Sequence, residues 1–262
     1  MTISSFKNKT QLKKGVRLLG AGILLSSLSL YTSCKDAEAE ENSVSVSKIK
    51  DAKDFAQYVD PMIGTAKMGH TYPGATVPFG SVQLSPDTDT IPYAVDGHYN
   101  PDVYKYCAGY QYEDKTIVGF SHTHFSGTGH SDLGDFLIMP TIGDLKLNPG
   151  TATNPESGYR SRFSHDKENA EAGYYSVMLD DYNVKAEMTA TSRVGMHQYS
   201  FPEGEDAHVV FDLMHGIYNY DDKNVWTFVR VENDTLVTGL KIASIGIVSS
   251  VSSFRLFFTA GE

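Results

Sequence analysis

The chain has 262 residues, of which 22 are Lys or Arg and 32 are Asp or Glu, so its formal net charge is −10. Five of the basic residues lie within the first 33 positions, which leaves the remainder more acidic still. An acidic body repels phosphate backbones, so we expect no nucleic-acid partner, and a neutral substrate such as a sugar fits better. Tyr and Phe are frequent (16 and 13, against one Trp), and with 23 Gly and 10 Pro they favour a turn-rich all-β domain.

Residues 1–33 have the pattern of an export signal. A basic segment ends at Arg17, and the apolar run from Leu18 to Leu30 is shorter than the ~20 residues that a membrane-spanning helix needs. The run leads into Tyr-Thr-Ser-Cys, and small residues before Cys34 resemble a bacterial lipoprotein processing site. There the cysteine receives a lipid and becomes the new N-terminus. A plain secretory peptide with an incidental cysteine is the alternative.

Residues 34–54 are polar and begin with an acidic run, a composition typical of a flexible tether. An acidic run directly after a lipidated cysteine resembles the surface-export signal of Bacteroidetes lipoproteins. We therefore expect an exported lipoprotein held by its lipid at the outer membrane or cell surface, with a periplasmic location as the alternative. If Cys34 is acylated, Cys107 has no partner for a disulfide, and two cysteines are too few for a Cys-based structural zinc site.

From Phe55 onward the chain reads as short strands between turns, with no helix of ten or more residues. This spacing predicts a two-sheet antiparallel β-sandwich with long loops. The stretch from Tyr58 to Ser131 is dense in Gly, Pro, His and Asp, and a loop-rich region of this length is usually functional. Strands are expected at Gly109–Tyr112, Thr116–Ser121, Phe136–Ile142, Ala172–Leu179, Val184–Thr191, Arg193–Phe201, His208–Leu213, Val225–Val231 and Thr235–Gly239.

Three segments carry a family resemblance. They are YVDPMIGT (58–65), GHTYPGATVPFGSVQLSPDT (69–88) and CAGYQYEDKTIVGFSHTHFSGTGHSDLGDFLIMP (107–140). Together they resemble the N-terminal domain of glycoside hydrolase family 92, and the similarity runs from about Tyr58 to Gly239. The resemblance implies a calcium-dependent, inverting exo-α-mannosidase that acts on mannose-containing glycans. It also implies that the sandwich is followed by a helical (α/α)6 domain holding the general acid, the general base and most calcium contacts.

The resemblance divides the chain into a family domain at 55–240 and an atypical tail at 241–262, which reads like a truncation or a frameshift. We expect the helical catalytic domain to be absent and to be a missing partner. Accordingly, no catalytic residue and no metal ligand are expected in this chain, and calcium is expected only in a full-length enzyme. The alternatives are a non-catalytic surface glycan-binding lipoprotein and an inert fragment.

Two histidines are candidates for sugar binding. His122 and His124 sit at i and i+2, so on a strand both would point to the same face. They would then donate to sugar hydroxyls at the rim of a pocket, or else bond to loop carbonyls as structural residues. A zinc site is disfavoured because no third ligand has suggestive spacing and calcium prefers oxygen ligands.

Asp87, Tyr106 and Cys107 are the other substrate-binding candidates. Asp87 follows Ser85-Pro86 in an expected turn, where its carboxylate could accept from two sugar hydroxyls or cap the turn. Tyr106 and Cys107 lie where the family contributes an aromatic, often Trp, near the leaving-group subsite; packing in an aromatic core is the alternative. Asp132 and Asp135 are expected to brace loops, and Trp226, in a strand pattern, is expected to pack in the core.

Replacing Cys34 with Ala should release the protein from membranes, because the cysteine thiol is the expected site of lipid attachment. Membrane fractionation and lipid labelling of Cys34→Ala beside the unmodified chain test this. A variant that fractionates and labels like the original would contradict the lipoprotein interpretation.

Overall fold

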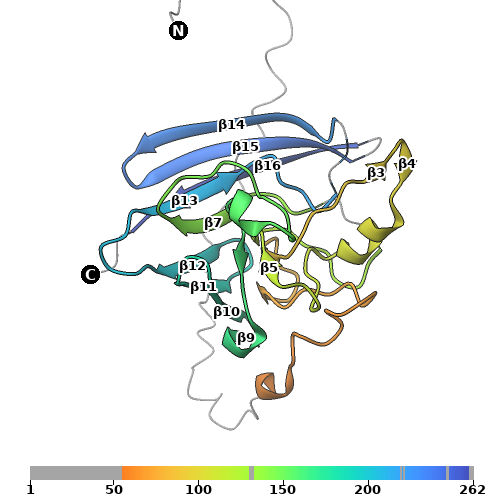
Figure 1. Ribbon diagram of the computed structural model, residues 1–262, viewed down its shortest axis with the longest axis horizontal. Coiled ribbons are helices and arrows are strands. Elements are labelled where there is room, and N and C mark those ends of the chain that lie inside the picture. Colours follow the sequence, from red (N-terminus) through yellow and green to blue (C-terminus); the bar gives the residue numbers. More distant parts are fainter. Residues whose placement is uncertain (1–54, 130–132, 219, 221, 246–247, 260–262) are drawn as a thin grey trace, which may run out of the picture. The chain divides into compact units, whose positions relative to one another are not determined.

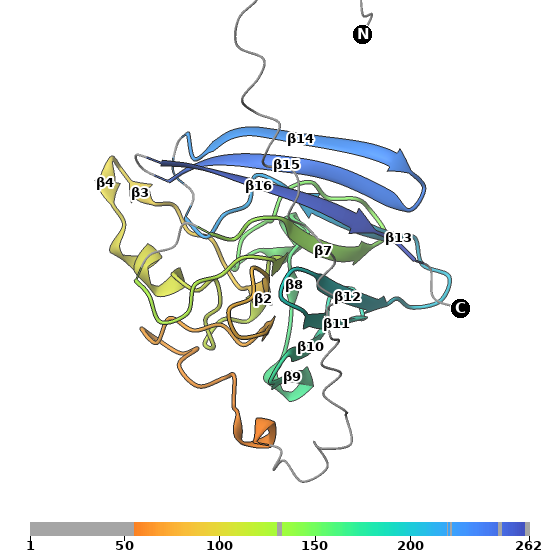
Figure 2. The same ribbon diagram turned by 180° about the vertical axis from the view of Figure 1, so that it is seen from behind.

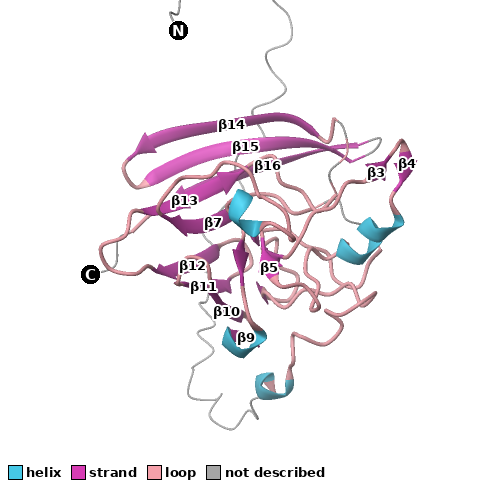
Figure 3. Cartoon of the chain, viewed as in Figure 1, coloured by secondary structure: helices cyan, strands magenta, loops and turns pink. Residues whose placement is uncertain are grey.

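The structure of the chain is a computed structural model that describes residues 55–129, 133–218, 220, 222–245 and 248–259. The expected signal peptide and tether, with Cys34, and the loop residue Asp132 lie outside the described residues. Figures 1 and 2 show antiparallel sheets joined by long loops. Helices in the described part are short 3-10 segments (Figure 3): η2 Ala56–Tyr58, η3 Pro101–Tyr106, η4 Pro155–Ser157 and η5 His165–Lys167. None of the described helices is long and apolar enough to cross a bilayer.

Two sheets form a sandwich. The first has the order β1-β2-β6-β7-β13, with β1 Ala75–Thr76, β2 Gln83–Asp87, β6 Gly119–Ser121, β7 Leu137–Ile142 and β13 Ala207–Asp212. The second has the order β12-β11-β10-β9, with β9 Glu168–Glu171, β10 Tyr174–Leu179, β11 Val184–Ala190 and β12 Gly195–Ser200. Two short pairs flank them: β3 Ala94–Val95 with β4 His98–Tyr99, and β5 Thr116–Ile117 with β8 Ser161–Arg162.

The main core lies between these two sheets. Along β11 every second residue is buried, and β10 is buried over most of its length, so the two strands present a continuous apolar face. Each fully buried Val, Leu, Met or Phe side chain in this core stabilises the fold by ~1.5–3 kcal/mol. The expectation of an all-β antiparallel sandwich is confirmed. Large members of the core cluster include Leu84, Tyr110, Phe120, Leu137, Met139, Tyr159, Tyr175, Leu179 and Met188.

A third sheet, which the two-sheet expectation did not include, lies beside β7 and β13 (Figures 1 and 2). It is an antiparallel meander of β14 Asn224–Asn233, β15 Leu236–Ile245 and β16 Val248–Phe257. Ring contacts Phe136–Phe254 and Phe211–Phe258 join it to the first sheet. The expectation that Trp226 packs in the core is wrong, because Trp226 is 51% exposed. Strand periodicity gives alternate faces but does not reveal which face a neighbour covers.

The stretch set apart as a tail contributes to this sheet. The boundary at residue 240 falls inside β15, and β16 consists entirely of later residues. Lys241 is buried: its Nζ lies 3.1 Å from Oδ1 of Asp135, with side chains only 1% and 7% exposed, and donates to the carbonyl of His215. Asp135 follows β6 and His215 follows β13, so Lys241 ties the third sheet to two loops of the first. Asp135 braces its loop, as expected.

The strand expected at Gly109–Tyr112 is absent from the structure. Gly109 has a φ of +79°, in the left-handed region, which an extended strand does not allow. The segment instead follows η3 and turns: the Gly109 amide donates to the Tyr106 carbonyl at 2.8 Å, and the Tyr112 amide donates to the Thr65 carbonyl at 3.1 Å. Apart from this segment, each strand expected from periodicity overlaps an observed one, although Thr116–Ser121 is split into β5 and β6.

Replacing Lys241 with Met should destabilise the fold by ~3–5 kcal/mol, because the carboxylate of Asp135 would stay buried without its cation. Urea unfolding at pH 7 measures this. Lys167→Met is the matched control, because Lys167 pairs with Asp180 at an exposed site, where an ion pair contributes little. The double variant Lys241→Met/Asp135→Asn should recover part of the loss. Equal stability of Lys241→Met and Lys167→Met would show that the buried pair does not hold the third sheet.

Candidate functional site

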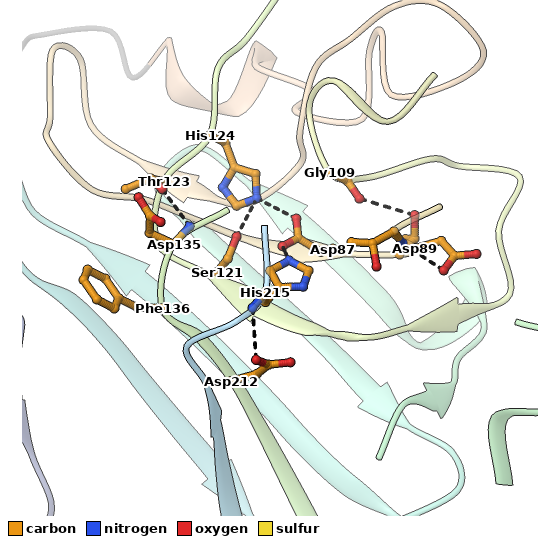
Figure 4. A network of polar contacts seen from close by, with 12 residues as sticks. Asp87, Asp89, Gly109, Ser121, Thr123, His124, Asp135, Phe136, Asp212 and His215 are labelled. Carbon is orange, nitrogen blue, oxygen red and sulfur yellow. Dashed lines mark hydrogen bonds and ion pairs between the residues drawn. The ribbon is translucent and has the colours of Figure 1, made fainter. Parts of the chain in front are cut away.

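Asp87, at the end of β2, is the centre of a buried network (Figure 4). Its side chain has no exposed surface; Oδ1 accepts from Nε2 of His124 at 2.8 Å, and Oδ2 accepts from Nε2 of His215 at 2.6 Å. His124 follows β6 and His215 follows β13, so three strands of one sheet bring the groups together. Burial by itself would raise the pKa of Asp87, but the two imidazoles outweigh it and hold the pKa of this carboxyl well below its usual range.

The protonation of His124 follows from its hydrogen bonds. Nδ1 lies 2.8 Å from the carbonyl oxygen of Gln83, which can only accept, so Nδ1 carries a proton. Nε2 faces the ionised carboxylate of Asp87, which also only accepts. Both ring nitrogens therefore donate, and the imidazole is a cation. Asp87 and His124 thus form a buried ion pair.

This network requires glycine at position 109. A Cβ placed on Gly109 would lie 2.0 Å from Oδ1 of Asp87. The backbone also links the network to the next segment: the Thr88 amide donates to the Gly109 carbonyl at 2.9 Å, and the Gln111 amide donates to Oγ1 of Thr88 at 3.0 Å. The segment 109–111 is therefore fixed directly against the buried charges.

His122 belongs to a separate series of hydrogen-bonded, uncharged side chains. Its Nδ1 donates to the carbonyl of Phe136 at 2.8 Å, which leaves Nε2 to accept from Nε2 of His197 at 3.0 Å. Nδ1 of His197 then accepts from the hydroxyl of Tyr199 at 2.7 Å. Burial lowers the pKa of His122 to about 4, and burial beside His122 lowers the pKa of His197 well below its usual value. Each nitrogen in this series has one role, and each imidazole is uncharged.

A pocket of about 350 Å³ opens beside segment 109–111. Tyr106 is half-buried in its wall, and its hydroxyl donates to Oδ1 of Asp114 at 3.3 Å. Oδ2 of Asp114 is buried and has no hydrogen-bond partner. The volume is at the lower end of the ~300–1,000 Å³ of small-molecule sites. The lining residues are Lys67, Met68, Lys105, Tyr106, Gln111, Glu113 and Asp114.

Asp114 is the carboxyl group whose environment best suits contact with a ligand in this pocket. Burial raises its pKa, and the nearby charges of Asp89 and Glu113 raise it further, against the hydrogen bonds from Thr88 and Tyr106. A carboxyl with one unpaired, buried oxygen can accept from a ligand hydroxyl. In the described part of the chain, no group of three or more His, Cys, Asp or Glu side chains is arranged to hold a metal ion.

The structure separates the five residues predicted to bind substrate. Only Tyr106 lines the pocket. Both oxygens of Asp87 are taken by imidazoles, and His124 is buried with it, so these two form a scaffold rather than the sugar contact considered from sequence. The premise that His122 and His124 share a strand face is wrong, because β6 ends at Ser121. Cys107 has no exposed surface, and its thiol donates to the carbonyl of Tyr104 at 3.0 Å.

Sequence reasoning missed His215, Asp114 and the buried position of Lys241. His215 lies 128 residues from its partner Asp87, and nothing in its local sequence indicates the pairing. Asp114 does have a weak signal, since it lies in the polar run Gln-Tyr-Glu-Asp-Lys within the segment that carries the family resemblance.

The hydrogen-bonded series of uncharged groups His122, His197 and Tyr199 predicts that the fold is sensitive to acid. In the folded state His122 and His197 stay uncharged at pH 5, whereas in the unfolded state both are protonated below about 6.5. The unfolded state therefore binds more protons between about pH 6.5 and 4, and stability falls as the pH is lowered through this window. Urea unfolding at several pH values measures the slope.

His197→Gln is the variant that tests this explanation, because a Gln amide can still donate to His122 and accept from Tyr199 but cannot titrate. His197→Gln should reduce the slope of unfolding free energy against pH by the amount that corresponds to about one bound proton. His208→Gln, at a more exposed imidazole that bonds to the Gly143 carbonyl, is the control for the substitution itself. An unchanged slope in His197→Gln would assign the acid sensitivity to other groups.

Comparisons with known proteins agree on one family. Residues 58–261 match the model of the glycosyl hydrolase family 92 N-terminal domain, a range that includes most of the stretch set apart as a tail. An uncharacterized secreted glycosidase of Arthroderma benhamiae is 28% identical over 220 residues, which are 80% of this chain and 26% of the relative.

Solved structures give the same result. The family GH92 α-mannosidase BT3965 from Bacteroides thetaiotaomicron, in complex with mannoimidazole, is 45% identical with a TM-score of 0.64, over 71% of this chain and 23% of that chain. The GH92 family glycosyl hydrolase ccman5 is 27% identical with a TM-score of 0.59, over 77% and 26%. The chain thus spans about a quarter of the length of these relatives. It belongs to the glycosyl hydrolase family 92 N-terminal domain family.

Proposed function

We propose that this chain is the N-terminal domain of an exported exo-α-mannosidase that hydrolyses mannose-containing glycans with inversion. The observation that carries the proposal is the 45% identity with a GH92 α-mannosidase over 71% of this chain. The name of the curated relative, a secreted glycosidase, supports export. Attachment to the outer membrane through a lipid on Cys34 is part of the same proposal.

In this proposal the chain supplies one wall of the sugar site. The ring of Tyr106 and the side chain of Met68 offer apolar surface to the C–H face of a sugar, and the unpaired oxygen of Asp114 accepts from a hydroxyl. Lys67 and Lys105 are donors at the same wall. The Asp87 network holds this wall from within the protein and does not touch the sugar.

The catalytic acid and base are proposed to come from elsewhere. Inversion needs two carboxyl groups ~6.5–9.5 Å apart on opposite faces of the sugar ring, with room for water on one side. Glu113 and Asp114 are adjacent in sequence and line a single wall, so they do not enclose a ring from both faces. We propose that the family's helical domain supplies both groups and most of the calcium contacts.

The second candidate function is a non-catalytic surface glycan-binding lipoprotein. The observation that favours it is that residues 67–114 form the whole pocket, so sugar binding does not require another domain. Sugar binding without hydrolysis by the isolated chain fits both candidates, and catalysis after addition of a helical domain fits only the first.

The chain by itself should not turn over an aryl α-mannoside in the presence of calcium. Loss of one general acid or base costs ~10²–10⁴ in rate, and the proposal has both missing. Adding the separately produced helical region of the 45% identical relative should restore hydrolysis. In that mixture Tyr106→Ala should raise KM by roughly tenfold, which corresponds to ~1.4 kcal/mol of lost binding.

Tyr112→Ala is the control, because Tyr112 stacks on His165 and is not part of the pocket wall. Hydrolysis by the chain alone, within tenfold of a full-length relative, would show that the catalytic groups lie in this chain. No hydrolysis after the helical region has been added, although the two polypeptides form a complex, would favour the binding-protein alternative.

A further inference from the structure

The outer face of the third sheet is exposed and rich in apolar side chains. Directly opposed residues in antiparallel strands share a face of the sheet. The register of β14, β15 and β16 therefore places three rows of side chains on the outer face. Trp226 is 51% exposed, Phe228 39%, and Val251 68%. The opposite face carries the buried residues Gly239, Lys241 and Ala243. The rows are Trp226–Ile242–Val251, Phe228–Leu240–Ser253 and Arg230–Thr238–Arg255.

Two exposed aromatic side chains, called here the platform, lie next to each other on this face. The rings of Trp226 and Phe228 lie 6.0 Å apart between centroids, with an angle of 21° between their planes. Both side chains are partly exposed, so both rings keep apolar surface in contact with solvent. Exposed aromatic surface of this kind suits a ligand that is apolar on one side.

Polar side chains border the platform. A groove of about 470 Å³ runs from Phe228 across the sheet and is lined on its polar side by Arg230, Thr238, Ser253 and Arg255. Glu232 accepts from Arg230 at 2.7 Å and from Thr238 at 2.8 Å, which orders these side chains. The groove therefore combines an aromatic wall with polar side chains, of which Arg230 and Thr238 are ordered by Glu232. It shares no residue with the pocket at Tyr106.

A saccharide has the matching chemistry, because a pyranose ring has an apolar C–H face and a rim of hydroxyl groups. A purely apolar protein segment would desolvate the guanidinium groups of Arg230 and Arg255 and offer them no acceptor, which is costly. We infer that the outer face of β14–β16 is a second saccharide-binding surface, on which pyranose rings stack against Trp226 and Phe228 while their hydroxyls bond to Arg230, Ser253 and Arg255. The identification of mannose in the saccharide rests on the proposed function. The inference that this surface binds a saccharide does not rest on it.

Trp226 is the one tryptophan of the chain, so its fluorescence reports on this surface directly. Titrating the full chain with α-mannan should shift or quench the tryptophan emission to saturation. Phe228→Ala keeps the fluorophore and should weaken the apparent affinity at least about tenfold. Val231→Ala is the matched control, because Val231 is 70% exposed on the same strand but points to the other face. Tyr106→Ala, at the separate pocket, should weaken the titration less than Phe228→Ala does.

The outcomes separate this inference from the proposed function. A response to a β-glucan or a xylan, and none to α-mannan, would keep the saccharide surface and count against mannose as the ligand. No response to any of the three polysaccharides, or a response that Phe228→Ala leaves within twofold, would overturn the inference. So would an emission that changes with protein concentration and not with saccharide, because the face would then be a contact between protein molecules.

Discussion

The carboxylate of Asp87 is fully buried, and the fold around it exists only if two imidazoles reach it from two other strands. An unpaired ionised carboxylate in this position would cost several kcal/mol, so the end of β2, the loop after β6 and the loop after β13 have to meet there. The same requirement excludes any side chain at Gly109. A second buried pair, Lys241 with Asp135, extends the constraint to the third sheet. Since each of these buried charges has a partner of opposite sign, the two ion pairs add no net charge to the interior.

This network determines where the pocket lies. Thr88, next to Asp87, holds the segment 109–111 through backbone and side-chain hydrogen bonds, and that segment leads directly into Asp114. Asp87, His124 and His215 are of types that often perform catalysis, but here they act as a rigid support, while Tyr106 and Asp114 line the pocket. A support of buried, mutually satisfied polar groups is rigid because no member can move without leaving its partners unsatisfied.

The domain offers two exposed regions with the chemistry of sugar recognition, the pocket at Tyr106 and the platform at Trp226. They share no lining residue and are built differently: the pocket from loops of the first sheet, and the platform from the regular pleat of β14. Two weak sites on one domain can hold a polymeric ligand more tightly than either site does separately, provided that the glycan reaches both. In the proposed exo-α-mannosidase, such a second contact would lengthen the residence time on the glycan.

The sequence by itself determined the class of fold and the family. Period-two alternation in segments such as 174–179 and 184–191 depends only on the pleat of a strand, so those strands are found close to where they were expected. The motifs between 58 and 140 identified the family for a similar reason, since they are local and contiguous. Tyr106 could be proposed for the pocket wall on the same grounds.

Only the tertiary structure decided which side chains are inside and which face outward. Asp87 and His215 are 128 residues apart, and Lys241 and Asp135 are more than 100 apart, so their pairing depends on sheet order, which no local pattern encodes. Trp226 and Lys241 show the point most directly, because both lie on strands with ordinary alternation. The tryptophan is exposed and the lysine is buried, since the face of the third sheet that packs on the sandwich is the one that carries Lys241.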